Sequence, residues 1–124
     1  MPKTVLIVED NPVHAKMIKD VVRVQGFDTV HAPSGEAVHA LARDHRPDLV
    51  IMDIQLPGLS GIDVTKAIKA DDDLKDIPII AVTAFASKRN QNEIREAGCV
   101  DILTKPFSVP ELIEIVVKYL GDTV

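Results

Sequence analysis

The sequence predicts an α/β fold, a flavodoxin-like (βα)5 doubly wound parallel sheet with strand order 2-1-3-4-5. Short apolar runs rich in β-branched residues recur along the 124 residues, and a segment with helical spacing of apolar residues follows each run. Continuous apolar runs of this length indicate strands covered on both faces, as in a parallel sheet. Their alternation with helices indicates right-handed crossovers that place helices on both faces.

Five segments are predicted as strands. Four are short, mainly apolar runs rich in β-branched residues, over Val5–Val8, Leu49–Met52, Ile79–Val82 and Val100–Leu103. The fifth run, Phe27–His31, is more polar, which is typical of a strand at the edge of a sheet.

A helix is predicted after each strand, because each intervening segment opens with a capping residue. These candidates share a short polar side chain ahead of an apolar helical repeat: Asn11, Ser34, Ser60, Ser87 and Ser108. Pro12 suits the first position of a helix, and Gly26 and Gly98 are expected helix ends. Glu111 stands three residues after Ser108, which predicts a capping box for the last helix.

Composition excludes several functional classes. The hydrophobic share of 46% and the charged share of 27% are those of a globular protein rather than a disordered chain. The net charge of −5 argues against a sequence-independent grip on nucleic acid or on an anionic membrane. With one tyrosine, three phenylalanines and no tryptophan, the chain offers little material for stacking nucleic-acid bases.

One domain over residues 1–124 is expected, because this length suits a single core and no linker or repeat interrupts it. The chain ends at Val124, shortly after the last predicted helix, so we expect no output domain. Cys99 cannot form an internal disulfide and is predicted to be buried. The apolar runs are too short to span a bilayer and the N-terminus does not resemble a signal peptide, so a cytoplasmic location is expected.

Polar residues stand at the ends of four predicted strands. Glu9 and Asp10 follow the first strand and Asp53 the third, while Thr83 follows the fourth and Lys105 comes after the fifth. In open parallel sheets the site lies outside the carboxyl ends of the strands, where the strand order reverses. Any one of these residues alone would be read as a solvated turn, but the set predicts a site.

The chemistry of this set points to phosphoryl transfer. Three carboxylates at close range repel one another, and oxygen ligands without a nearby histidine or cysteine favour Mg²⁺. Lys105 adds a positive charge and Thr83 adds a hydroxyl, which together can hold phosphoryl oxygens. Asp53 is the candidate nucleophile, because it ends a central strand between the acidic pair and the other two residues.

Four segments, in order and at matching spacings, resemble the receiver domain of two-component response regulators. They are Val5–Asn11, Met52–Gly61, Ile79–Ala84 and Lys105–Phe107, and the resemblance covers essentially the whole chain. The second of these segments also resembles single-domain receivers of the DivK type, together with three further strings: Asp71–Leu74, Ala81–Ala86 and Gly98–Cys99.

The resemblance implies a role for each site residue. Asp53 would accept a phosphoryl group from a histidine kinase or a histidine phosphotransfer protein, and Lys105 and Thr83 would hold the phosphoryl oxygens. Mg²⁺ would be bound by Asp10, Asp53 and the backbone carbonyl of Gln55, with Glu9 acting mainly through water. The protein would be a signalling module rather than an enzyme, catalysing only its own phosphotransfer and autodephosphorylation. Its output would be phosphorylation-dependent binding to a downstream protein, such as a kinase.

The positions expected to switch on phosphorylation depart from the family pattern at one point. An aromatic residue commonly stands three positions before the lysine, whereas this chain has Ile102 there, which has no ring to change rotamer together with Thr83. Phe85 could supply an aromatic output surface or simply pack in its loop. The family also implies a cis peptide bond before Pro106, which the X-Pro sequence allows.

Two other functional classes fit the residues less well. Haloacid-dehalogenase-like phosphatases normally carry a second aspartate two residues after the nucleophile, where this chain has Gln55. A flavodoxin-like FMN binder needs phosphate-binding donors after the first strand, where Glu9 and Asp10 would repel the phosphate.

Two further segments give expectations about surfaces. The first predicted helix carries more apolar residues than one buried stripe needs, which we interpret as a partner surface. His14, on this helix just after the acidic loop, is the histidine expected to touch the site. The acidic run Asp71–Asp73 is interpreted as a solvated loop.

Overall fold

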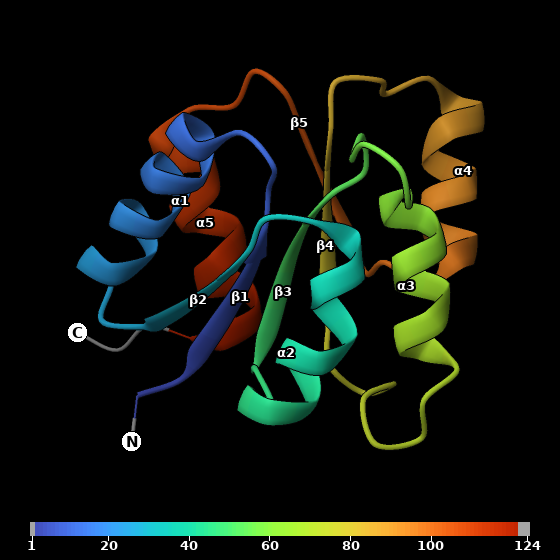
Figure 1. Cartoon of the computed structure of the whole chain (residues 1–124). Coiled ribbons are helices and arrows are strands. Elements are labelled where there is room, and N and C mark those ends of the chain that lie inside the picture. Colours follow the sequence, from blue (N-terminus) through green and yellow to red (C-terminus); the bar gives the residue numbers. More distant parts are fainter. Residues whose placement is uncertain (1, 122–124) are drawn as a thin grey trace.

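The computed structural model describes residues 2–121; Met1 and residues 122–124, on which the expectations about the chain ends depend, lie outside this range. Five parallel strands form one sheet in the order β2-β1-β3-β4-β5, which confirms the predicted fold class. The strands are β1 (Thr4–Val8), β2 (Asp28–Ala32), β3 (Leu49–Asp53), β4 (Ile79–Thr83) and β5 (Asp101–Thr104) (Figure 1).

The strand bounds differ slightly from the predicted ones. β2 and β5 each begin one residue later than expected, because Phe27 packs into the core ahead of β2 and Val100 is exposed ahead of β5. β3 and β4 extend far enough to include Asp53 and Thr83. Two of the predicted site residues are therefore held in the sheet itself rather than in loops.

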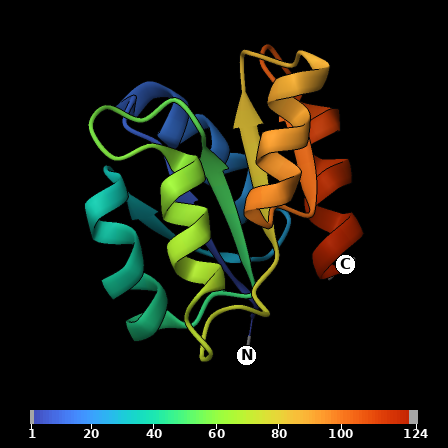
Figure 2. The same cartoon turned by 90° about the vertical axis from the view of Figure 1, so that its right-hand side faces the viewer.

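In the described part of the chain, four α-helices connect the strands and a fifth follows β5. They are α1 (Pro12–Val24), α2 (Val38–His45), α3 (Gly61–Lys69), α4 (Lys88–Ala97) and α5 (Val109–Leu120). α1 and α5 cover one face of the sheet, and α2, α3 and α4 cover the other (Figures 1 and 2). Among the described residues, no helix combines the length and the apolar character needed to cross a membrane.

The predicted caps explain where most helices begin. Asn11, Ser60 and Ser87 each accept hydrogen bonds from backbone N–H groups in the first turn, and Ser108 and Glu111 form the capping box. The expectation for Ser34 is wrong, because its side chain makes no cap bond. The chain first forms a 3₁₀ turn over residues 35–37, so the α-helix starts too far downstream for the Ser34 hydroxyl to reach its N–H groups.

The sheet separates two apolar layers. Alternate residues of β1 face opposite sides: Leu6 packs toward α2, α3 and α4, whereas Ile7 packs toward α1 and α5. Full burial of a side chain such as Ile51 contributes about 1.5–3 kcal/mol to stability. Cys99 is buried as predicted, and burial raises the pKa of its thiol. The two layers leave the carboxyl ends of the strands open at one edge of the sheet, where polar residues gather.

Candidate functional site

Three carboxylates meet at the carboxyl ends of the two central strands. β1 and β3 pair with Val8 opposite Met52, so the residues that follow, Glu9 and Asp53, are brought side by side. Carboxylate oxygens of Glu9, Asp10 and Asp53 all lie within 4.8 Å of one another. Glu9 and Asp53 are only 2% and 3% exposed, whereas Asp10 lies at the surface. The cluster is therefore half-enclosed, with one carboxylate open to solvent.

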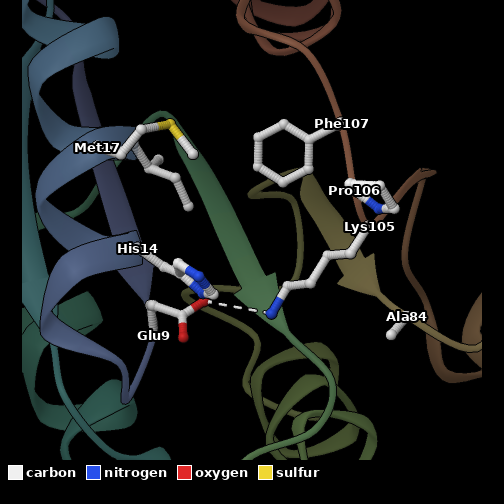
Figure 3. A pocket seen from close by; sticks show the side chains of 8 residues that line it. Glu9, His14, Met17, Ala84, Lys105, Pro106 and Phe107 are labelled. Atoms are coloured by element: carbon white, nitrogen blue, oxygen red, sulfur yellow. Dashed lines mark ion pairs between the residues drawn. The ribbon is translucent and has the colours of Figure 1, made fainter.

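Lys105 is the cation of this cluster. Its Nζ lies 3.3 Å from Asp53 Oδ2. It also lies 3.7 Å from Glu9 Oε2, and this second ion pair is the dashed line in Figure 3. The backbone N–H of Lys105 donates to the carbonyl of Thr83 at 2.8 Å, which fixes the start of the β5–α5 loop against β4. The peptide bond between Lys105 and Pro106 is cis, as the family resemblance implied. A single lysine thus faces three carboxylates, and the cluster keeps an excess of negative charge.

The electrostatics of Glu9 reflect that excess. Burial raises the pKa of Glu9 above its ordinary value, and the nearby charge of Asp53 raises it further. The N–H of Asn11, which donates to Glu9 Oε1 at 3.1 Å, and the charge of Lys105 act in the opposite direction. The three carboxylates repel one another, and a hard divalent cation bound by their oxygens would offset that repulsion. The cluster could therefore hold a metal ion such as Mg²⁺.

Gln55 joins Asp53 to Thr83. Its backbone N–H donates to Asp53 Oδ1 at 2.9 Å, and its side-chain Nε2 donates to Thr83 Oγ1 at 2.8 Å. The Thr83 hydroxyl also accepts from the N–H of Phe85 at 3.0 Å and donates to the carbonyl of Phe85 at 3.2 Å. Sequence reasoning considered only the backbone carbonyl of Gln55, since nothing in the sequence shows that residues 28 apart share a hydrogen bond.

Gly61 allows the β3–α3 loop to return close to Asp53. The N–H of Gly61 donates to the carbonyl of Ile54 at 3.2 Å. A Cβ at residue 61 would lie 2.5 Å from the carbonyl oxygen of Asp53 and 2.8 Å from Ile54 Cα. Because both atoms belong to the backbone, no side-chain rotation could relieve that contact.

A second residue missed by sequence reasoning is His31. Its Nε2 lies 2.8 Å from the backbone carbonyl of Glu9, at hydrogen-bond distance. β2 and β1 pair with Ala32 opposite Val8, which places His31 beside the acidic loop. The only signal in the sequence was its place near the end of the edge strand, and that position alone does not indicate a contact.

The predicted switch positions occupy different environments. Phe85 is 61% exposed, so much of its ring is not packed in its loop, and its part in an output surface stays a prediction. Ile102 is half-buried and packs against the core layer beneath α2, α3 and α4. Pro106 is exposed and lies in the loop that follows β5. An exposed aromatic side chain thus adjoins Thr83, and an aliphatic one occupies the position expected of a switching ring.

An open cavity of about 350 Å³ lies beside the carboxylates, between α1 and the β5–α5 loop. Met17 on α1 and Phe107 on the loop line opposite sides, with Glu9 and Lys105 below them (Figure 3). His14 lines the same cavity, in agreement with the expectation that it touches the site. Met17 and Phe107 are both half-buried, so partly exposed apolar side chains flank the approach to the carboxylates.

Comparison with known proteins agrees with this geometry. Residues 5–117 match the family model of the response regulator receiver domain. The chain is 51% identical over 122 residues to the polar-differentiation response regulator DivK of Brucella anthropi, covering 98% of this chain and 99% of that protein. It is 49% identical to the protein of the same name from Brucella ovis, with the same coverage.

Solved structures give the same picture. A putative response regulator from Chloroflexus aurantiacus superimposes with a TM-score of 0.91 at 34% identity, covering 98% of this chain and 99% of that one. The receiver domain of the sensor histidine kinase PA1611 from Pseudomonas aeruginosa superimposes with a TM-score of 0.88 at 34% identity, covering 98% and 100%. That second structure has a magnesium ion coordinated in its active-site cleft.

Proposed function

The chain belongs to the response regulator receiver domain family, and from this premise we propose that Asp53 is its phosphoacceptor. Receiver domains of this family take phosphoryl groups from histidine kinases and act on downstream targets, as signalling modules rather than classical enzymes. One observation carries the assignment to Asp53. Of the two buried carboxylates in the cluster, Asp53 lies nearer the Lys105 ammonium group, at 3.3 Å against 3.7 Å for Glu9, and it is the one joined to Thr83 through Gln55.

The proposed reaction is a direct transfer. A carboxylate oxygen of Asp53 attacks the phosphorus of a phosphohistidine, the P–N bond breaks, and the bonding pair stays with the departing imidazole nitrogen. An acyl phosphate on Asp53 results. Lys105 and Thr83 would bind its oxygens, the first by charge and the second by a donated hydrogen bond. In autodephosphorylation a water molecule would attack the same phosphorus, the P–O bond to Asp53 would break, and the carboxylate would be restored as inorganic phosphate leaves.

The residues that would hold Mg²⁺ are Asp10 and Asp53 directly, Glu9 through water, and the backbone carbonyl of Gln55. The fit rests on three carboxylate oxygens within 4.8 Å that a single lysine neutralises incompletely. When bound, the cation supplies positive charge that offsets the charge of the incoming phosphoryl oxygens.

The donor would approach over the cavity between α1 and the β5–α5 loop. Its floor contains Glu9 and Lys105, and its apolar walls would contact the side chains that surround a phosphohistidine on a partner helix. Charge added at Asp53 would then shift Thr83, together with Phe85, Ile102 and Pro106, and so change the surface offered to a downstream protein. We propose a single receiver domain over residues 1–124, acting in the cytoplasm. Support for one domain comes from the match over 98% of this chain and 99% of DivK.

Transfer from a labelled phosphohistidine donor tests the function. The Mg²⁺-loaded wild-type protein should gain an acid-labile label, and Asp53→Asn should gain none. Asp72→Asn is the matched control, because the Asp72 side chain is 94% exposed and lies in a loop away from the cluster. Labelling of Asp53→Asn at the wild-type level would show that the phosphoacceptor is another residue.

A further inference from the structure

The side-chain amide of Gln55 holds two groups at the start of the β4–α4 loop. Nε2 donates to Thr83 Oγ1 at 2.8 Å, and Oε1 accepts from the backbone N–H of Ala84 at 3.2 Å. The N–H of Ala84 can only donate, so it fixes which end of the amide is oxygen and which end faces Thr83. The amide therefore bridges a hydroxyl and the backbone of the residue that follows it.

The Thr83 hydroxyl has no hydrogen-bonding capacity left. A hydroxyl donates one hydrogen bond and accepts two. Here the donated bond goes to the carbonyl of Phe85, and the accepted bonds come from the N–H of Phe85 and from Gln55. To donate to a phosphoryl oxygen, the proton must leave the Phe85 carbonyl. Any displacement of Thr83 Oγ1 away from the amide would also break its bond to Gln55.

Gln55 contacts the phosphoacceptor at its other end. Its backbone N–H donates to Asp53 Oδ1 at 2.9 Å, so one residue touches both the carboxylate that would be phosphorylated and the hydroxyl that would respond. The Gln55 side chain is exposed, which leaves the amide free to exchange its protein partners for water. Its bond to Thr83 can thus be broken without burying an unpaired polar group.

We propose that the Gln55 side chain is a positioning residue that holds Thr83 toward its own loop and so opposes the switch to the phosphorylated state. This inference rests on the proposed function, in which Asp53 accepts a phosphoryl group and Thr83 binds it. Removing the amide frees Thr83 Oγ1 and makes the phosphorylated arrangement easier to reach. Loss of Gln55 should therefore strengthen binding of a phosphoryl group rather than weaken it.

The test measures the affinity of the Mg²⁺-loaded protein for beryllofluoride, a mimic of the phosphoryl group. Gln55→Met keeps the length of the side chain and removes the amide. It should bind beryllofluoride on the order of three- to tenfold more tightly, the factor expected for one lost hydrogen bond. In NMR spectra without beryllofluoride, the Thr83 methyl signal of this variant should shift toward its position in the bound wild-type protein. Gln55→Leu, which removes the amide with a different shape, should show the same gain.

Two controls separate positioning from loosening of the loop. Gln91→Met removes an amide that donates to the carbonyl of Ala86 in the same loop, at 2.8 Å, without contacting Thr83, and should leave the affinity within twofold of wild type. In a Thr83→Val background, Gln55→Met should give no gain, because the hydroxyl on which it acts is gone. Mg²⁺ affinity is measured in parallel for each variant, so that the beryllofluoride affinities are compared at equal occupancy of the Mg²⁺ site.

The outcomes distinguish this inference from the function beneath it. If the wild-type protein binds no beryllofluoride in Mg²⁺, both the proposed function and the role of Gln55 are wrong. If the wild-type protein binds it and Gln55→Met binds equally or more weakly at unchanged Mg²⁺ affinity, only the role of Gln55 is wrong. A gain that persists in the Thr83→Val background would likewise overturn it, because the effect would not pass through Thr83.

Discussion

Two groups of three acidic residues differ in where they lie in the fold and in which positively charged side chains they contact. Glu9 and Asp10 follow β1 and Asp53 ends β3, and Lys105 lies within 4 Å of two of these carboxylates, those of Glu9 and Asp53. Asp71, Asp72 and Asp73 are consecutive and lie in the loop between α3 and β4, at the opposite edge of the sheet (Figure 1). The three consecutive aspartates are thus not the group whose carboxylates converge in the folded protein; the converging group comes from separate parts of the sequence.

The second group is neutralised from outside the loop. Asp71 Oδ2 lies 2.8 Å from His39 Nε2 and 2.6 Å from Arg43 Nη2, both on α2, and Arg43 also reaches Asp73 at 3.6 Å. The interpretation as a solvated loop is wrong for Asp71, whose side chain is 8% exposed, and holds for Asp72. Among residues 2–121, the first group is the one whose oxygens converge as metal ligands do.

One carboxyl group in each cluster has a shifted pKa, and the two shifts have opposite signs. Burial raises the pKa of Glu9, whereas the N–H of Asp73, with His39 and Arg43, lowers the pKa of Asp71. The cluster of Glu9, Asp10 and Asp53 keeps an excess of negative charge that a cation could neutralise. Asp71, in contrast, is already paired with His39 and Arg43. A functional acidic site is thus better recognised by carboxylates that lack enough neighbouring positive charge than by the number of acidic residues.

Mg²⁺ binding should show the largest difference between the two groups. Asp10→Asn removes a proposed ligand and should weaken Mg²⁺ binding by about a hundredfold. Loss of a residue that only hydrogen-bonds to a metal ligand typically lowers metal affinity by about 10- to 100-fold, and loss of a ligand itself should cost at least as much. Asp72→Asn should leave the affinity unchanged. Titration with Mg²⁺, followed by NMR or calorimetry, measures the affinity of each variant. Equal affinities in the two variants would show that Asp10 is not a Mg²⁺ ligand.

Gly61→Ala should disturb the first group through the backbone. The new Cβ would overlap the carbonyl of Asp53, so the free energy of unfolding should fall by about 1–3 kcal/mol and Mg²⁺ binding should weaken as Asp53 moves. Denaturant unfolding and the same Mg²⁺ titration measure the two effects. Gly121→Ala offers a contrast, since a Cβ there would meet no atom within 4 Å. Its φ of 81° should still cost some stability while leaving Mg²⁺ affinity intact.

Glu9→Gln should stabilise the protein in the absence of divalent cations. Because its pKa is raised by folding, ionised Glu9 costs stability at neutral pH, and this cost disappears as the pH falls through the raised pKa. The free energy of unfolding of Glu9→Gln should therefore exceed that of wild type by roughly 1 kcal/mol near pH 7. The two should converge in acid. Chemical denaturation at several pH values, with a chelator present, measures the free energy of unfolding of both proteins. A variant less stable than wild type at pH 7 would show that ionised Glu9 does not destabilise the protein.

The smallest expected effect belongs to Asp71 and has the opposite sign. Its pKa lies below the ordinary value of 3.8, so its carboxylate contributes stability above that pH and loses the contribution as the pH falls through the lowered pKa. Asp71→Asn should be less stable than wild type at neutral pH and equally stable in strong acid. Thermal unfolding across this range checks the sign. A difference that persists in acid would mean that the carboxylate charge is not its source.

The fold could be predicted because its signals are local. Continuous apolar runs identified the buried strands, and Asn11, Ser60, Ser87 and Ser108 identified four helix starts through hydrogen bonds that span only a few residues. The place of the site also followed, because every parallel strand ends at the same edge. Ser34 misled the prediction, since a serine cannot reveal that a 3₁₀ turn intervenes before the α-helix.

By itself the sequence determined the alternating strands and helices, the edge at which Glu9, Asp53, Thr83 and Lys105 gather, and the family to which the chain belongs. Only the tertiary structure decided which polar groups meet across elements: the Gln55 amide with Thr83, and Asp71 with α2. The physical reason is one of range. Periodicity and capping act within a few residues, whereas a side-chain hydrogen bond between elements depends on positions within a few tenths of an ångström, which packing of the whole core sets.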